Sequence, residues 1–246
     1  MLVYGINAVI EALKARRVVA IRVSLRGGER LQQVVSLAER DGIPVRRVDP
    51  ASIDRETRGG VHQGVVADVR TVDAYSLTDV VNGAVGPPLL IVLDGIEDPQ
   101  NVGAMIRTAD AAGVHGVIRQ TRRAAALDGI AAKASAGAVA HVKIVHVVNI
   151  ARALEDLKGL GVWSVGLDGA APRRYDQVDL TMPVALVFGA EGAGLRRLVR
   201  ARCDFLASIP MRGRVESLNV SVAAGVVLFE AVRQRGATRN ASQTDR

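Results

Sequence analysis

Residues 89–95 read LLIVLDG, an uninterrupted apolar run that ends in an Asp-Gly pair. A run of this length, preceded by two prolines, is typical of a strand buried on both faces, as in a parallel sheet. The residues that follow, IEDPQNVGAMIRTADAAG (96–113), predict a helix over about 101–112 that ends before a glycine. A fully buried strand followed at once by a helix predicts the α/β class.

The same alternation continues toward the C-terminus. Because helices separate the apolar runs, these strands are expected to form a parallel sheet. The segment 236–246 has no apolar pattern, and we expect a disordered tail there. The remaining expected strands cover 114–119, 142–148, 161–167 and 184–188, and the remaining expected helices cover 128–135, 149–158, 195–201 and 217–235.

Toward the N-terminus, residues 1–75 show shorter helices and strands in alternation, which predicts a compact α/β/α domain with a net basic charge. Regular patterning then stops, and Gly-Pro-Pro at 86–88 is a strong breaker. We therefore expect a front domain over 1–75, a linker over 76–86 and a second domain over 87–235.

Composition limits the classes of protein. The single cysteine and four scattered histidines predict no disulfide and no metal site, and fit a reducing cytoplasm. No uncharged run is long enough to span a membrane, and the start has no signal-peptide pattern. Net charge is +7, from 28 Arg and 4 Lys against 25 acidic residues. The arginine excess has two readings, codon bias or recognition of phosphates.

Three segments contain more glycine and small polar residues than strand ends require. In the first (93–113), Asn101 is expected as the N-cap of the helix. Arg107 is surrounded by Ala, Met, Ile and Thr. An arginine in such surroundings either extends to solvent or binds an anion, and the sequence leaves both open.

The second segment, ALVFGAEGAGLRRL (185–198), is a strand, a glycine-rich turn and a helix. Its GxxGxG spacing differs from the GxGxxG of dinucleotide loops, and Glu191 would repel a phosphate. The glycines are better explained by close approach of the backbone to an uncharged ligand surface.

The third segment, RVESLNVSVAAG (214–225), follows Ile-Pro-Met at 209–211 and opens the last helix. Ser217 or Asn219 could serve as its N-cap, but one cap suffices and three small polar residues are present. The surplus beside a glycine-rich turn favours a binding site.

Together the motifs NVGAMIRTA (101–109), FGAEGAG (188–194) and IPM with SLNVSVAAG (209–225) resemble the three motifs of the SpoU (TrmH) family of SPOUT methyltransferases. That family transfers a methyl group from S-adenosylmethionine to a ribose 2′-hydroxyl of RNA. YGINAV (4–9) and GGVHQGVVA (59–67) resemble the L30e-like substrate-binding domain of its 23S rRNA guanosine-2′-O-methyltransferases.

The resemblance implies an N-terminal L30e-like domain and a C-terminal SPOUT α/β domain with a parallel sheet and a trefoil knot. It also implies a homodimer that binds RNA, with 23S rRNA as the expected target. The cofactor-binding residues it implies are Gly189, Glu191, Gly192, Ile209, Met211 and Leu218. The catalytic residues it implies are Asn101, Arg107, Glu191, Ser217 and Asn219.

Because a guanidinium stays protonated, we expect Arg107 to bind a substrate phosphate and stabilise the developing alkoxide rather than act as a base. Asn101 and Glu191 are expected to orient Arg107. Two alternatives stay open: methylation of tRNA, and a non-catalytic RNA-binding protein of ribosome assembly. Binding of S-adenosylmethionine would separate an enzyme from a pure binding module.

Overall fold

The structure, a computed structural model, describes residues 2–25, 28–69, 75–121, 131, 134–135 and 137–244. The chain divides into two compact units. The helix expected over 128–135 falls largely outside the described residues. Unit 1 contains residues 1–73, 99–107 and 125–141, and unit 2 contains residues 74–98, 108–124 and 142–246.

Unit 1 is built on a four-stranded sheet in the order β1-β4-β2-β3. Strand β4 is antiparallel to both of its neighbours, whereas β2 and β3 are parallel. Helices α1 (Ile6–Lys14) and α2 (Glu29–Arg40) belong to the larger of its apolar clusters. Helix α3 (Pro50–Thr57) places Ile53 in a second cluster on the other face. The strands are β1 (Leu2–Tyr4), β2 (Val18–Ser24), β3 (Val45–Val48) and β4 (Val65–Val69).

The expected α/β/α alternation of the front segment is therefore confirmed, with strand β1 as an addition. The segment 76–86, expected as a linker, contains helix α4 (Leu77–Asn82). A capping box starts this helix: Asp79 N donates to Ser76 Oγ (3.1 Å), and Ser76 N donates to Asp79 Oδ2 (2.8 Å). These two bonds satisfy the first backbone donors, so a short helix forms where the apolar pattern is weak.

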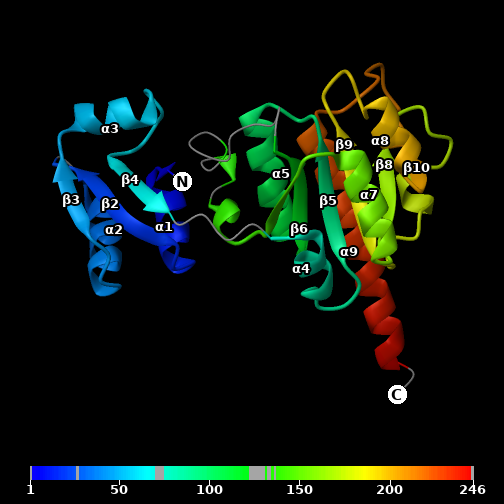
Figure 1. Cartoon of the computed structure of the whole chain (residues 1–246), viewed down its shortest axis with the longest axis horizontal. Helices are drawn as coiled ribbons and strands as arrows, with labels where there is room; N and C mark the ends of the chain where they lie inside the picture. Colours follow the sequence, from blue (N-terminus) through cyan, green and yellow to red (C-terminus); the bar gives the residue numbers. More distant parts are fainter. Residues whose placement is uncertain are drawn as a thin grey trace. The chain divides into compact units, whose positions relative to one another are not determined.

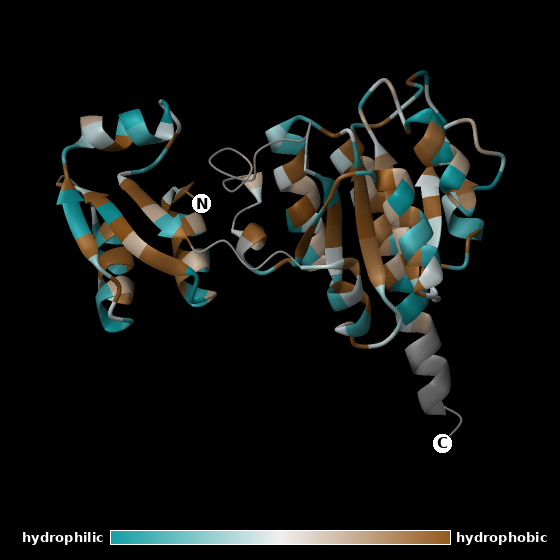
Figure 2. Ribbon diagram, viewed as in Figure 1, coloured by the Kyte–Doolittle hydropathy of each residue, from teal (hydrophilic) through white to brown (hydrophobic). Residues whose placement is uncertain are grey.

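Unit 2 contains a six-stranded sheet in the order β10-β8-β9-β5-β6-β7. Every pairing in it is parallel, which confirms the expected sheet. Strands β5 and β9 lie at its centre and are hydrophobic along their length (Figure 2). The strands are β5 (Leu89–Asp94), β6 (Gly116–Gln120), β7 (Ile144–Val147), β8 (Trp163–Leu167), β9 (Val184–Gly189) and β10 (Phe205–Ala207).

Helices cover both faces of this sheet (Figure 1). Helices α4, α7 (Ile150–Gly159) and α8 (Arg197–Arg202) contribute to one apolar cluster on the near face. Helix α9 (Val220–Thr244) lies behind the sheet and continues past residue 235, through part of the segment expected as a disordered tail. Helix α5 (Pro99–Ala111) follows β5, and the short turns η1 (Ala138–Ala140) and η2 (Tyr175–Gln177) complete the order.

Because all six strands run in the same direction, their carboxyl ends share one edge of the sheet. The loops that follow β8, β9 and β10 therefore meet, although their strands lie far apart in the chain. Open α/β sheets bind ligands at this edge. The trefoil knot that the resemblance implies stays a prediction.

Candidate active site

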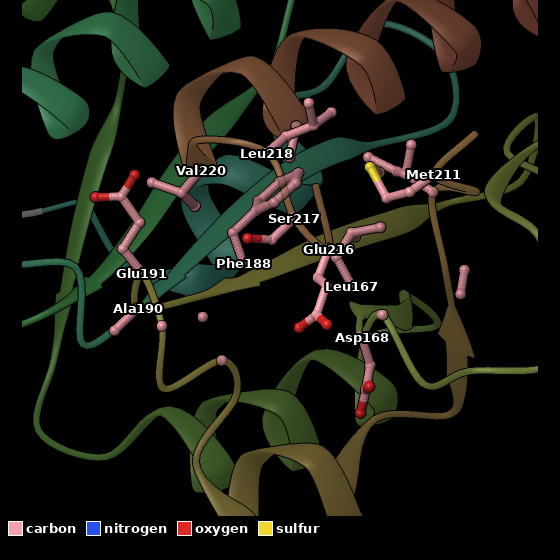
Figure 3. Close-up of a pocket in the computed structure, with 17 residues that line it drawn as sticks. Leu167, Asp168, Phe188, Ala190, Glu191, Met211, Glu216, Ser217, Leu218 and Val220 are labelled. Atoms are coloured by element: carbon pink, nitrogen blue, oxygen red, sulfur yellow. The ribbon is translucent and has the colours of Figure 1, made fainter. Parts of the chain in front are cut away.

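A pocket of about 400 Å³ lies at the carboxyl edge of the six-stranded sheet, within unit 2 (Figure 3). The ends of β8, β9 and β10 line it, together with the loop after β9 and the segment that leads into α9. Its volume falls within the range of roughly 300–1,000 Å³ that is usual for small-molecule sites. Its apolar lining includes Leu167, Phe188, Ile209, Met211, Leu218 and Val220.

This pocket gathers residues that the sequence analysis assigned to the cofactor. They come from the ends of two strands and from the start of the last helix, which the parallel sheet brings to one edge. Ser217, from the expected catalytic set, lines the same pocket. All six expected cofactor residues are among the lining: Gly189, Glu191, Gly192, Ile209, Met211 and Leu218.

The glycine-rich loop after β9 is a tight turn held by its own backbone. Ala190 N donates to Gly194 O (3.1 Å), and Gly194 N donates to Ala190 O (2.8 Å). Gly192 and Gly194 have φ of 73° and 65°, values that favour glycine. A Cβ on Gly189 would lie 2.1 Å from the carbonyl carbon of Gly194, so the turn closes only on glycine. A Cβ on Gly192 would meet no protein atom within 4 Å.

Asn219 connects the pocket to the start of α9. Its Oδ1 accepts hydrogen bonds from Ser221 N (2.9 Å) and Ser221 Oγ (2.6 Å), as an N-cap does. Its Nδ2 donates to Glu191 Oε1 (2.8 Å). Asn219 therefore caps the helix and orients a pocket carboxylate at the same time. Of the three small polar residues in the motif, Ser221 belongs to the cap and Ser217 faces the pocket.

Three carboxylates line the pocket: Asp168, Glu191 and Glu216 (Figure 3). Asp168 is held by a hydrogen bond from Arg200 Nε and by another from Ala170 N (2.9 Å). The hydrogen bond from Arg200 holds the pKa of Asp168 below its usual value, so this carboxyl is ionised near neutral pH. Among the described residues, no lysine, arginine or histidine lines the pocket. The lining therefore suits a ligand that carries positive charge.

Asp168 and Glu216 were not expected in the site from the sequence. Asp168 directly follows the strand expected over 161–167, and Gly169 comes next. A polar residue and a glycine after a buried strand are the signal that drew attention to 93–113 and 185–198, so Asp168 could have been found in the same way. Glu216 stands beside Ser217 in the third motif but carries no signal of its own.

Asn101 and Arg107 lie on the part of α5 that belongs to unit 1. Asn101 is buried, and it lies in the first turn of a helix that begins at Pro99. The expectation that Asn101 is the N-cap is wrong, because proline favours the first helical position and starts the helix earlier. The Arg107 side chain is exposed, and it forms no hydrogen bond or ion pair with another described residue. The structure thus groups Glu191, Ser217 and Asn219 in unit 2 and places the other two expected catalytic residues in unit 1.

The other reactive groups among the described residues form no second centre. In the part of the chain that the structure describes, no three His, Cys, Asp or Glu side chains form a group that could hold a metal ion. Burial raises the pKa of the Cys203 thiol to about 12, so this thiol is protonated and a poor nucleophile. Among the described helices, none is both long and apolar enough to cross a membrane.

The fold and the pocket define an α/β protein with a cavity of small-molecule size at the carboxyl edge of a parallel sheet, lined by a glycine-rich loop and three carboxylates. Residues 88–229 match the SpoU rRNA methylase family, and residues 2–74 match the RNA 2′-O ribose methyltransferase substrate-binding domain. The chain belongs to the SpoU rRNA methylase family.

Three similar proteins illustrate the match. The 23S rRNA (guanosine-2′-O-)-methyltransferase RlmB of Yersinia pestis is 46% identical over 240 residues, which cover 96% of this chain and 98% of that protein. The SpoU methyltransferase AviRb of Streptomyces viridochromogenes, solved in complex with AdoMet, is 27% identical with a TM-score of 0.82, covering 96% and 91%. A structure solved to study the 2-OH methylation of C/U34 on tRNA is 31% identical, with a TM-score of 0.56. The match covers 61% of this chain and 98% of the chain in that structure.

Proposed function

We propose that this chain transfers a methyl group from S-adenosylmethionine to the ribose 2′-hydroxyl of a guanosine in 23S rRNA. Family membership supports the reaction class, and the RlmB relative matches over nearly its whole length. The observation that carries the proposal is the pocket, which gathers all six residues expected at the cofactor.

The pocket fits S-adenosylmethionine in size and chemistry. Apolar side chains such as Ile209, Met211 and Leu218 suit the adenine ring. The open space at Gly192 lets the ligand approach the backbone closely. The sulfonium and ammonium groups of the cofactor are positive, which matches the acidic lining.

S-adenosylmethionine supplies an activated methyl group on its sulfonium. The chain must orient the cofactor, position the ribose and help the hydroxyl lose its proton. We assign Ser217 and Asn219 to positioning of the ribose and of the methionine end of the cofactor. Glu191, whose carboxylate is already fixed by Asn219, acts at the same end of the pocket.

We assign Arg107 to the RNA. Its guanidinium stays protonated, so it binds a substrate phosphate and stabilises the alkoxide as the proton leaves to phosphate or water. The Arg107 side chain is exposed and forms no hydrogen bond or ion pair with another described residue, so its guanidinium can bind an anion. Both observations support this assignment. Asn101, on the same helix, is proposed to orient Arg107 during the reaction.

Methylation of tRNA is the weaker alternative. The tRNA methylation structure covers 61% of this chain, whereas the RlmB relative covers 96%, including the segment that matches the substrate-binding domain. We therefore assign residues 1–75 to holding rRNA. The substrate places the protein in the cytoplasm.

We also propose a homodimer. On α9, Val222, Phe229 and Val232 are 52%, 51% and 38% exposed, and their spacing places them along one side of the helix. An apolar surface of this kind marks an interaction site. Val227 of the same helix is 1% exposed and packs in the core. Phe229→Glu should give a monomer by light scattering, whereas Val85→Glu, at an apolar residue 85% exposed elsewhere, should not.

The decisive experiment maps 2′-O-methyl groups on 23S rRNA from a strain that lacks this gene. One guanosine should lose its methyl group and regain it when the purified protein acts on that rRNA with S-adenosylmethionine. Restoration on tRNA alone would establish the alternative. A protein that binds RNA but gives no calorimetric signal with S-adenosylmethionine would contradict the enzymatic assignment.

A further inference from the structure

A buried ion pair joins two segments of unit 2 that lie far apart in the chain. Asp94, the last residue of β5, is 0% exposed. Its carboxylate accepts hydrogen bonds from Arg196 N (2.8 Å) and Arg196 Nε (2.6 Å), and Arg196 Nη2 lies 2.5 Å from Oδ1. One carboxylate thus binds both the backbone and the guanidinium of a single arginine.

This pair fixes the far end of the glycine-rich loop. The loop leaves β9 at Gly189, whose Cα partner in the neighbouring strand is Asp94. It turns back through the reciprocal bonds of Ala190 and Gly194, and Arg196 ends it against the same carboxylate. Both ends of the loop are therefore attached at the carboxyl ends of two adjacent strands. Between these attachments lie Glu191 and Gly192, which line the pocket.

The Arg196 side chain does not pack in the hydrophobic core. The Arg196 side chain is 47% exposed, whereas its partner is fully buried. A planar guanidinium that meets a carboxylate through two nitrogens is held in direction as well as in distance, which a lysine cannot reproduce. The contact therefore sets where the loop ends more than it adds buried apolar surface.

We propose that Asp94 and Arg196 are positioning residues for the cofactor: they hold the loop so that Glu191 and Gly192 face the ligand. This inference rests on the proposed binding of S-adenosylmethionine. Neither residue lines the pocket, so both act through the loop. Loss of the pair should weaken the cofactor complex before it affects the reaction of the bound complex.

Arg235 provides the matched control. Its guanidinium also ties segments of unit 2 together, through the carbonyl oxygens of Leu180 (2.9 Å), Pro87 (2.6 Å), Pro88 (3.1 Å) and Met182 (2.9 Å). These carbonyls lie beside the amino ends of β5 and β9, opposite the pocket. Arg196→Met and Arg235→Met each remove one structural arginine from the same unit, but only the first releases the loop.

The test measures the Kd of S-adenosylmethionine by calorimetry, the KM of cofactor and of rRNA, kcat, and thermal stability, all on full-length protein. Arg196→Met should raise the cofactor Kd and KM at least tenfold, with kcat at saturating cofactor and the KM for rRNA within about threefold of the parent protein. Arg235→Met should lower thermal stability and leave the cofactor Kd unchanged. Asp94→Asn should resemble Arg196→Met, and the double variant should show less than the product of the two effects.

An unchanged cofactor Kd in folded Arg196→Met overturns the proposal, as does an equal rise in Arg235→Met. If Arg196→Met does not fold, Arg196→Lys decides: a severalfold rise in cofactor Kd supports the inference, and parental affinity overturns it. Failure of the proposed function would show in the parent protein, which would then bind no S-adenosylmethionine. Failure of the present inference would show only in the variants, with binding by the parent protein intact.

Discussion

The two ends of the six-stranded sheet use their polar groups differently. At the amino ends, Arg235 binds four carbonyl oxygens, and Leu89 N donates to His115 Nδ1 (3.0 Å), so the protein satisfies its own groups. At the carboxyl ends, the Asp94 carboxylate has its hydrogen bonds from Arg196. The side chains of Ser217 and Glu216 line a pocket and form no hydrogen bond or ion pair with other described residues. A parallel sheet thus has one end suited to stability and one suited to binding, and substitutions should separate the two.

The largest effect should come from Arg107, on helix α5, which follows strand β5 in the chain. Arg107→Ala should lower methyl transfer by about 10²–10³-fold, because one cationic donor to the developing alkoxide is lost. The cofactor Kd, measured by calorimetry, should stay within about twofold. Loss of cofactor binding would make Arg107 a structural residue. A group with a near-neutral pKa in the pH–rate profile that vanishes in Arg107→Lys would favour Arg107 as the base.

The next largest effect should come from the turn that forms the pocket. Gly189→Ala introduces a Cβ that would lie 2.1 Å from the Gly194 backbone, so the loop must move. We expect cofactor affinity to fall by roughly 10–100-fold, the equivalent of about 1–3 kcal/mol of overpacking. Gly159→Ala, at the end of α7 where a Cβ meets no atom within 4 Å, is the control. Equal affinity in the two variants would contradict the assignment of this pocket.

At the amino ends, Arg235→Met should act on stability alone. It removes the guanidinium donor from four carbonyl oxygens, of which Pro88 O keeps its hydrogen bond from Val184 N, and this should cost about 3 kcal/mol and lower Tm by roughly 6–12 °C. Calorimetric unfolding with and without S-adenosylmethionine measures both the loss and the stabilisation that the ligand provides. Stabilisation by the ligand should match that of the parent protein. A smaller stabilisation would show that the two ends are coupled.

The smallest effect should be the acid sensitivity of the amino ends. Burial lowers the pKa of His115, so the folded protein binds a proton there less readily than the unfolded chain. The contribution of neutral His115 to the free energy of unfolding is therefore fully present above the pKa of about 6.5 in the unfolded chain. It is lost as the pH falls toward the lower pKa of the folded protein. His115→Asn keeps an acceptor for Leu89 N and removes the titration, so its urea stability should fall less between pH 7 and about pH 5. His146, whose pKa burial also lowers, titrates in both proteins.

Much of this architecture could be predicted from sequence, because long elements carry a clear period. Strand β5 was predicted from its uninterrupted apolar run, and helix α7 lies within one residue of the range 149–158 that was expected for it. Strands β1 and β10 have three residues each, too few for a period to be read. Helix α4 was missed although Ser76 and Asp79 have capping-box spacing, since a domain boundary was expected there.

The site was predicted unevenly for a similar reason. Local motifs and the family resemblance supplied the residues now found in the pocket, such as Gly189 and Leu218. The contact between Asp94 and Arg196 joins residues 102 positions apart, and only the strand order brings them together. Nothing in the composition of either segment indicates that partnership.

The position of β9 also has a kinetic meaning. Leu89 of β5 pairs with Val184 of β9, so the two central strands of the sheet close a very long loop. Pairing of this kind folds slowly, because the entropy of closing the loop must be lost before the contacts form. During synthesis, β5 leaves the ribosome with both faces apolar, and these faces stay exposed until β9 has been made. The last strand of the four-stranded sheet is already complete at Val69. The nascent chain should therefore depend on a chaperone over this interval, and in refolding from urea the six-stranded sheet should form after the four-stranded one.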